Sequence, residues 1–467
     1  MRDILVGNCR DKLRELPAES AQCVVTSPPY LGLRRYQGEQ EAVWGGDPDC
    51  QHEWESRRYY VEQSVSATSR EAFAEAGEEN SARLKAARWR EDACCSRCGA
   101  WRGAFGLEPT PELYVAHTVE ILREIRRVLR PDGVLWWNVG DSYAGSGGAH
   151  AVHHSNPGIS NSWQRHGVPH WGQLGVPGRY LPPEGLKAKD LMLIPFRVAL
   201  GAQADGWWVR SVVVWSKPNS MPESVRDRPT ESHEYILLLT KSERYFYDAD
   251  AVREPLSETT IERNRYPHAG SACEEVAVSR PRRPGEFGNR AGRNLRSVWR
   301  FATVPYPGAH FAVFPPELPR RCILAGTPPK VCAECGAPWE RVRARETGGD
   351  DWRPTCECHG RAEIVPIECP ECGGTGVAGN EPCSACDRSG QIETRVWSDS
   401  ALQAWPTRPA VVLDPFAGSG TTLKVAEDLG RWWIGIDICE QYSEQIRART
   451  AQRSLTAAFE CTGGAQE

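Results

Sequence analysis

Residues 411–437 read VVLDPFAGSGTTLKVAEDLGRWWIGID. An apolar strand leads into a turn in which Gly418 and Gly420 let the backbone approach a ligand closely, and a helix opens at Thr421 with free N–H donors. The next strand ends at Asp437, whose carboxylate can accept hydrogen bonds from ribose hydroxyls. The predicted ligand contacts are Asp414, Pro415, Phe416, Gly418, Ser419, Gly420, Thr421, Thr422 and Asp437. The stretch lacks a phosphate-loop lysine and a GxGxxG pattern, which favours a nucleoside with a short tail over a triphosphate; the alternative is a strand–turn–helix unit that binds nothing.

The length and charge of the chain exclude several classes of protein. Its 467 residues, 40% hydrophobic and 25% charged, suit one large domain with insertions or two to three domains, and exclude a wholly disordered or collagen-like chain. A net charge of −5 excludes a uniformly basic DNA-coating protein but allows a local basic patch. No apolar run approaches the roughly 18 residues of a membrane span, and the N-terminus is not a signal peptide. We therefore expect a cytoplasmic protein without a membrane partner.

Helical and strand-like segments alternate along the regular parts of the chain, which predicts an α/β fold built on a parallel sheet. Apolar residues recur at helical spacing from Ile121 to Leu129, and Pro131-Asp132-Gly133 should end that helix. Buried strands are expected at 22–26, 134–139, 208–215, 234–240 and 432–436. The cysteine-rich segments between these units are expected to be insertions.

A proline-containing turn, Ser27-Pro28-Pro29-Tyr30, follows the first buried strand. Its prolines fix the backbone and leave carbonyl groups unpaired. Such a turn can present a carbonyl and a hydroxyl to an amino group, with an aromatic ring beside it for stacking. This arrangement suits the exocyclic amine of a flipped nucleobase; by itself, the tetrapeptide could equally be a surface turn with a tyrosine.

Together the two turns resemble those of the beta-class amino DNA methyltransferases, in which a catalytic motif precedes the cofactor motif. TSPPY at 26–30 and DPFAGSGTT at 414–422 carry the resemblance, and GVLWWNVGDSYAG, RPTESHEYILLLTKSERYFYD and HFAVFPPELPRRCILAGTPP extend it. The resemblance implies a Rossmann-like methyltransferase sheet, S-adenosylmethionine as cofactor and double-stranded DNA as substrate. It also implies that Ser27 and Pro28 accept hydrogen bonds from the amine and that Tyr30 stacks on the base. Asn8 stands where the family usually has Asp, close to the adenine of the cofactor.

The target base is expected to be cytosine, methylated at N4, because Ser-Pro-Pro-Tyr is closer to N4-cytosine enzymes and Asp-Pro-Pro-Tyr is typical of N6-adenine enzymes. N6-adenine methylation is the alternative. The motifs also leave open a catalytically silent DNA-binding zinc protein on the same scaffold and an enzyme that acts on RNA. A partner restriction endonuclease is compatible with the motifs, which give no oligomeric state.

Eighteen cysteines in a chain without an export signal are more typical of metal sites than of disulfides. Three foursomes have spacings that suit a closed tetrahedral zinc site, so two to three zinc ions are expected. The foursomes are Cys332, Cys335, Cys356 and Cys358; Cys369, Cys372, Cys383 and Cys386; and Cys50, His52, Cys95 and Cys98. The second resembles the zinc repeats of J-domain chaperones. His359 could replace Cys358 and Cys94 could replace Cys95, and free thiols are the alternative to metal.

A basic segment at 280–300 contains seven arginines and one acid, which favours contact with phosphates over a solvated loop. The arginines are Arg280, Arg282, Arg283, Arg290, Arg293, Arg296 and Arg300. The resemblance places a target-recognition region here, at 255–305. The predicted organisation is a catalytic-motif start at 1–44, a zinc insertion at 45–105, the methyltransferase domain at 106–254, the recognition region, a cofactor-side helix at 306–330, a second zinc insertion at 331–395 and the cofactor-binding part at 396–467.

Overall fold

The structure is a computed structural model that describes most of the chain. The described residues are 2–32, 41–60, 89–144, 186–187, 189–263, 292–304, 313–343, 350–360, 363–368, 375, 377–378, 381–382, 389, 391–396 and 398–451. Among them, no helix combines the length and the apolar character needed to cross a membrane.

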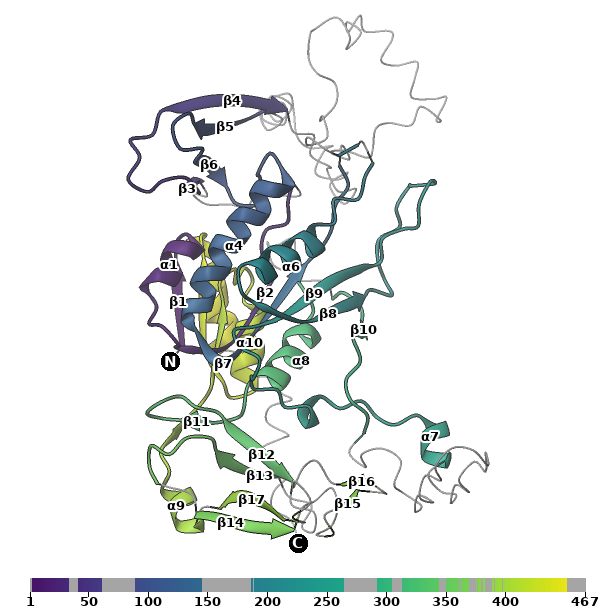
Figure 1. The fold of residues 1–467 in the computed structure, drawn as a ribbon. Helices are drawn as coiled ribbons and strands as arrows, with labels where there is room; N and C mark the ends of the chain where they lie inside the picture. The colour runs from purple at the N-terminus through teal and green to yellow at the C-terminus, as the bar shows by residue number, and fades with distance from the viewer. Residues whose placement is uncertain are drawn as a thin grey trace, which may run out of the picture.

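An eight-stranded sheet forms the centre of the molecule, in the order β1-β20-β19-β2-β7-β9-β8-β10 (Figure 1). Its strands are β1 (Arg2–Val6), β2 (Ala21–Thr26), β7 (Leu129–Val139), β8 (Trp208–Ser216), β9 (His233–Thr240), β10 (Val298–Arg300), β19 (Val411–Asp414) and β20 (Trp432–Asp437). The neighbours from β1 to β7 are parallel, whereas β9 runs antiparallel to β7 and β8. The predicted α/β fold built on a parallel sheet is confirmed by the strands from β1 to β7, and β9 adds an antiparallel strand that the pattern did not indicate. No helix separates β8 from β9, so the chain returns as a hairpin-like pair.

Helices cover both faces of this sheet. On one face, α1 (Cys9–Glu15), α4 (Pro111–Val128) and α6 (Ile194–Ala204) contribute Leu13, Ile121 and Val198 to one buried cluster. On the other, α8 (Glu317–Gly326), α10 (Thr421–Asp428) and α11 (Glu440–Ala451) contribute Ile323, Leu423 and Ile446 to a second. The apolar residues of α4 recur at helical spacing, as predicted, but the chain is already in strand β7 at Leu129. The helix therefore ends before Pro131-Asp132-Gly133, not at it.

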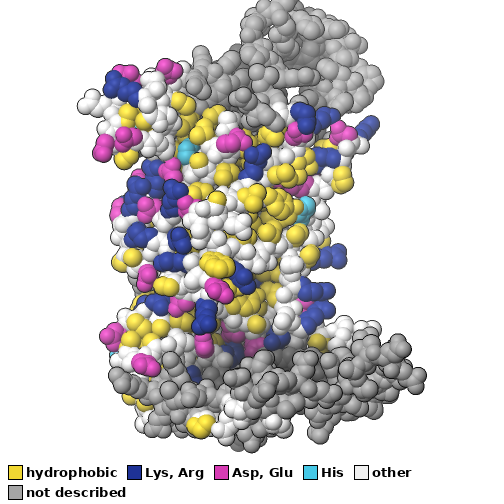
Figure 2. Space-filling view, in the orientation of Figure 1, with side chains coloured by type: hydrophobic (Ala, Val, Ile, Leu, Met, Phe, Trp, Pro, Cys, Tyr) yellow, Lys and Arg dark blue, Asp and Glu magenta, His cyan; other side chains and the backbone are white. Residues whose placement is uncertain are grey.

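One face of the molecule leaves large apolar side chains in solvent. Figure 2 shows hydrophobic side chains gathered near the middle of this view. Leu193, Phe196 and Leu200, around α6, and Trp208, at the start of β8, are exposed. Apolar atoms contribute more than half of the accessible surface of a typical folded protein, and these side chains form part of that surface here.

Smaller sheets lie at the two ends of the main sheet (Figure 1). At one end, β3 (Glu41–Trp44), β4 (Trp54–Tyr60), β5 (Trp89–Cys95) and β6 (Trp101–Ala104) form a sheet in the order β3-β6-β5-β4. At the other end, two-stranded sheets pair β11 (Val331–Cys332) with β18 (Thr407–Arg408), β12 (Trp339–Arg343) with β13 (Asp350–Pro354), β14 (Glu363–Glu368) with β17 (Gln391–Val396), and β15 (Val377–Ala378) with β16 (Glu381–Pro382). The short helices α7 (Glu258–Arg263), α9 (Asp399–Ala404) and η3 (Asp250–Val252) complete the described elements. The described residues of the segment 45–105, predicted as a zinc insertion, thus contain the strands β4, β5 and β6 of an antiparallel sheet.

Candidate active site

A cavity of about 520 Å³ opens at the carboxyl ends of the parallel strands. The proline turn follows β2, the glycine turn follows β19, and Asp437 ends β20. Because β2, β19 and β20 are neighbours and run in the same direction, both turns meet at one edge of the sheet although they are far apart in sequence. Ligands of open α/β sheets bind at this edge.

A hydrogen-bond network fixes the proline turn from outside. The hydroxyl of Tyr30 donates to Oε2 of Glu234 at 2.8 Å, and Nδ2 of Asn138 lies 2.9 Å from both Tyr30 Oη and Glu234 Oε2. Ser27 Oγ lies 3.2 Å from Tyr30 Oη and 3.3 Å from Asn138 Nδ2. Lys217 forms an ion pair with the other oxygen of Glu234. The network joins groups from β7, β9 and the segment after β8 to the turn and restricts the orientation of Ser27 and Tyr30.

Close packing holds the backbone of the same turn. The hydroxyl of Tyr114, on α4, donates to the carbonyl oxygen of Pro29 at 2.9 Å. Gly106 has a φ of +88°, and an added Cβ would lie 2.8 Å from Cβ of Pro29. An added Cβ at Gly140 would lie 2.8 Å from the Tyr30 ring. Both glycines therefore leave the space that the turn occupies.

The cofactor side of the cavity is organised around Asp437. Its Oδ2 accepts from the backbone N–H of Gly418 and its Oδ1 from that of Cys439, both at 2.8 Å. Burial raises the pKa of this carboxyl above its ordinary value. Each oxygen keeps a lone pair for a further donor, so Asp437 can still accept from a pair of hydroxyls. The carboxylate, the glycine turn and the size of the cavity fit S-adenosylmethionine.

Most of the predicted cofactor contacts lie on the cavity wall. The wall includes Asn8, Pro415, Phe416, Gly418, Ser419, Thr421 and Asp437, together with all four residues of the proline turn. Asn8 also begins α1, where its Oδ1 accepts from the N–H of Arg10 at 3.0 Å. This second bond gives Asn8 a structural role as well as its place on the wall.

Asp414, Gly420 and Thr422 lie behind the wall and do not line the cavity. Buried Asp414 accepts from Thr26 Oγ1 at 2.6 Å and from the N–H of Phe416 at 3.1 Å, and burial raises its pKa to about 6. Thr422 donates to the carbonyl of Val25 at 3.3 Å. Gly420 packs against Ile446. These residues connect the cofactor turn to β2 and to α11, so we expect them to act through the position of the turn.

Sequence reasoning missed several residues of the cavity wall, namely Trp44, Phe105, Asn138, Lys217 and Glu234. Two of them could have been recognised from the sequence. Asn138 is a polar residue within an apolar strand, and Glu234 lies at the start of another apolar strand; both are unfavourable places for a polar group without a partner. Trp44 and Phe105 come from the small sheet β3–β6 and the turn that follows it, and no periodicity in the sequence places them at the site.

Two of the three predicted metal clusters have their side chains together. The ligand atoms of Cys50, His52, Cys95 and Cys98 lie within 4.8 Å of one another, and so do those of Cys332, Cys335, Cys356 and Cys358. Neither Cys94 nor His359, the alternatives to Cys95 and Cys358, belongs to these groups. The foursome Cys369, Cys372, Cys383 and Cys386 lies outside the described residues.

The basic segment is described only in part, because Arg280, Arg282, Arg283 and Arg290 lie outside the described residues. Arg293 and Arg296 both contact Oε2 of Glu254, at 2.9 and 3.1 Å, while Arg300 ends the edge strand β10. One carboxylate shared by two guanidinium groups leaves a net positive charge at this point, as contact with phosphate requires.

Comparison with known proteins places this chain in a family. The profile of the DNA methylase family matches residues 21–332 and 401–448. The type II methyltransferase M.Cfr9I of Citrobacter freundii is 35% identical over 69% of this chain and 72% of its own, and M.SmaI of Serratia marcescens is 28% identical over 96% of this chain and 91% of its own. The solved cytosine-N4-specific PvuII DNA methyltransferase aligns over 98% of this chain and 88% of its own, at 12% identity and a TM-score of 0.43. The chain therefore belongs to the N6/N4 DNA methylase family and is an S-adenosylmethionine-dependent DNA amino methyltransferase.

Proposed function

We propose that the enzyme methylates N4 of a cytosine that is flipped out of double-stranded DNA into the cavity. The observation that carries the proposal is the hydroxyl of Ser27, which lies at the cavity in a network with Tyr30, Asn138 and Glu234. Adenine enzymes of the class, by resemblance, usually carry a carboxylate at this position. A neutral hydroxyl accepts more weakly but can also donate to a ring nitrogen beside the amine.

The residues of the turn would prepare the amine for attack. Its lone pair is delocalised into the ring, so acceptors for its hydrogens, Ser27 Oγ and the carbonyl of Pro28, would make the nitrogen more tetrahedral and more nucleophilic. Tyr30 would hold the base by stacking, with its hydroxyl fixed by Glu234 and Asn138. Alignment of the nitrogen with the methyl group supplies much of the remaining acceleration.

The cofactor would occupy the side of the cavity formed by Asn8, Phe416, Gly418 and Asp437. Bound S-adenosylmethionine supplies a methyl group activated by its sulfonium. Asp437 would accept from the ribose hydroxyls, and the N–H of Gly418, which already binds Asp437, holds that carboxylate in place. The chain provides orientation and desolvation, and the reaction requires no covalent nucleophile from the protein.

Further parts of the proposal concern metal, DNA and a partner. The two gathered foursomes would each hold a structural zinc ion, and the third foursome would raise the number to three. Arg293, Arg296 and Arg300 would contact DNA phosphates together with the rest of the basic segment. The relatives are type II methyltransferases, so a restriction endonuclease that recognises the same DNA sequence is the expected functional partner.

The target base can be identified directly. DNA methylated by the purified enzyme is digested to nucleosides, which are resolved by mass spectrometry. N4-methylcytosine as the main product supports the proposal. N6-methyladenine as the sole product overturns it and would show that Ser27 is a poor guide to the base. The absence of both products on DNA that contains all sequence contexts would favour a catalytically silent DNA-binding protein. Methylation of RNA alone would show that the substrate is RNA and not DNA.

A further inference from the structure

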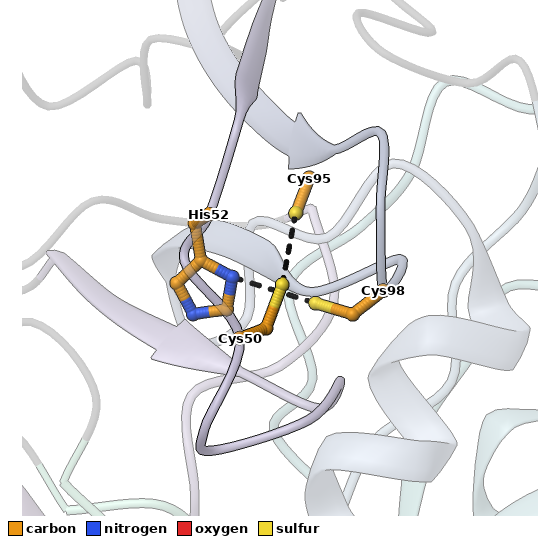
Figure 3. Close-up of side chains that lie close together, drawn as sticks. All are labelled: Cys50, His52, Cys95 and Cys98. Carbon is orange, nitrogen blue, oxygen red and sulfur yellow. Dashed lines mark hydrogen bonds between the residues drawn. The ribbon is translucent and has the colours of Figure 1, made fainter.

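The side chains of Cys50, His52, Cys95 and Cys98 point toward a common centre (Figure 3). Sγ of Cys50 lies 3.9 Å from Sγ of Cys95, and Sγ of Cys98 lies 3.4 Å from Nδ1 of His52. A tetrahedral zinc ion with Zn–S bonds of about 2.3 Å requires sulfur atoms about 3.8 Å apart. The spacing and the mixture of three thiols with one imidazole therefore fit a closed zinc site.

The four ligands come from the turns of the small sheet β3–β6. Cys50 and His52 lie between β3 and β4, Cys95 ends β5, and Cys98 lies in the turn to β6. A zinc ion would tie both connections together at one corner of the sheet. A four-stranded sheet of this size has a small core of its own, and a structural metal supplies folding free energy to such modules.

The segment that follows β3 lies directly against the metal corner. Gly46, two residues after Trp44, has a φ of +72°, and an added Cβ would lie 2.8 Å from Sγ of Cys98 and 2.6 Å from Cβ of Ala100. Trp44 is almost fully buried and its Nε1 donates to the carbonyl of Gly103, in β6, at 3.1 Å. Trp44 is therefore held by β6, the strand that follows Cys98, while the segment after Trp44 packs on the metal corner.

Trp44 and Phe105 connect the small sheet to the cofactor cavity through ring contacts. The rings of Trp44 and Phe105 are 5.4 Å apart, and Phe105 stacks on Phe416, in the glycine turn, at 5.9 Å. Arg10 lies 4.6 Å from the Trp44 ring and donates to the carbonyl of Val43 at 2.8 Å. The two rings thus form a wall between the start of α1 and the cofactor turn.

The same sheet is anchored to α4 by a buried polar pair. His117 stacks between Trp44 and Trp101, at 5.3 and 5.4 Å, and its Nδ1 lies 3.0 Å from Oε1 of Glu108. Oε2 of Glu108 accepts from the N–H of Gly106, the glycine that packs on the proline turn. Displacement of the small sheet would therefore disturb both turns of the active site.

We propose that a zinc ion bound by Cys50, His52, Cys95 and Cys98 positions Trp44 and Phe105 as a wall of the cofactor cavity, so that cofactor affinity depends on this metal. The inference rests on the proposed function only for the place of the cofactor in the cavity and is independent of the target base. Trp44 and Phe105 are then positioning residues that act on the cofactor through packing against Phe416.

The second foursome provides a matched control. Cys332, Cys335, Cys356 and Cys358 lie at the amino ends of the strands, opposite the cavity. The carbonyl of Cys335 accepts from Arg130, at the start of β7, at 2.6 Å, and the carbonyl of Gly336 accepts from Gln22, at the start of β2, at 3.2 Å. Metal bound there would stabilise the protein without touching the wall of the cavity.

The test compares two double variants of the full-length protein, Cys50→Ser/Cys98→Ser and Cys335→Ser/Cys358→Ser, in which only partly buried or exposed thiols are changed. Zinc is counted by elemental analysis, and the affinity for S-adenosylhomocysteine is measured by calorimetry without DNA. We expect each variant to lose one zinc ion. The first should bind the cofactor product roughly tenfold more weakly, since a lost aromatic contact contributes about this factor, and the second should bind it as the wild type does.

Three results would overturn the proposal: the first variant keeps its zinc, or loses it with unchanged affinity, or both variants lose affinity equally. Circular dichroism checks that the variants are folded. If the first variant does not fold, the single variant Cys98→Ser, which leaves three of the four ligands in place, replaces it, and the same three results decide. Because no DNA is present, a wrong assignment of the base affects none of these outcomes.

Discussion

The hydroxyl of Tyr30 donates to the carboxylate of Glu234 across 2.8 Å, although 204 residues separate them along the chain. Glu234 is the second residue of β9, the antiparallel strand, and its other oxygen forms an ion pair with Lys217 of the segment after β8. The charge of Glu234 is therefore compensated within the site. Because β9 is antiparallel, its first residues lie at the edge of the sheet where the parallel strands end. Glu234 can therefore fix the ring of Tyr30, which we propose to stack on the base.

Removal of this hydroxyl should slow the enzyme without affecting its cofactor. In Tyr30→Phe the ring remains, but its anchor to Glu234 and Asn138 is lost. A net hydrogen bond contributes about 1 kcal/mol, so kcat should fall roughly fivefold. Calorimetry should show unchanged affinity for S-adenosylhomocysteine. Tyr245→Phe, which removes a hydroxyl that accepts from Arg210, is the matched control; full turnover by Tyr30→Phe would contradict an orienting role.

Ser27→Ala should reduce turnover more than DNA binding. The missing acceptor matters most as the amine becomes tetrahedral, so the loss falls on the transition state. We expect kcat to fall by roughly one to two orders of magnitude for about 1.5–3 kcal/mol of lost stabilisation, with Kd for DNA little changed. Ser20→Ala, before the start of β2, controls for the substitution itself. A loss of DNA affinity with an unchanged kcat would show that Ser27 only binds.

Asp437→Ala should weaken cofactor binding by roughly 1–3 kcal/mol, because buried hydroxyls of the ribose and the N–H of Gly418 lose their acceptor. DNA binding should remain largely intact. Calorimetry with the cofactor and a gel-shift assay with DNA give the two affinities. Asp428→Ala, at the far end of α10, is the control. An unchanged cofactor affinity would remove Asp437 from the site.

Stability should depend on pH through Asp414. Burial raises its pKa from 3.8 to about 6 in the folded protein, so the folded state favours the protonated carboxyl. The stabilisation by the protonated Asp414 carboxyl is complete below about pH 4 and is lost as the pH rises through about 6. The free energy of unfolding should fall by roughly 3 kcal/mol across this range. Asp414→Asn cannot ionise and should gain in melting temperature over the wild type across that window. If the melting temperatures of the two proteins differ by the same amount at every pH from about 4.5 to 7.5, the raised pKa of Asp414 is refuted.

Arg293 and Arg296 should contribute to DNA binding through charge. Their replacement by Gln should weaken binding and lower the salt slope of log K by roughly 1–2. Glu254→Gln, which frees both guanidinium groups, should act in the opposite direction. Methylation at sites that differ in one base would reveal whether either arginine also reads sequence. An unchanged slope together with unchanged site preference would place the segment outside the interface.

Local patterns predicted the parts of the site that one continuous stretch encodes. Gly418 and Asp437 follow strands that the apolar pattern marks, and both lie on the cavity wall. Asp414 was predicted to contact the ligand because of its position, but its carboxylate accepts a hydrogen bond from Thr26 and so links the ends of β19 and β2. Trp44 reaches the cavity through strand pairing between β3 and β6, a long-range contact that periodicity does not encode. The antiparallel direction of β9 was missed for the same reason, since direction depends on the connection and not on the strand.

The order of strands has a consequence for synthesis on the ribosome. In the described sheet, β1 pairs with β20 and β2 is flanked by β19 and β7, so the earliest strands to be translated wait for partners among the last. Such non-local pairing makes folding slow, and the growing chain cannot build the side of the cavity that holds the glycine turn and Asp437 until β19 and β20 have emerged. A product that ends before β19 would therefore have the proline turn but lack Gly418 and Asp437, and we expect it not to methylate DNA.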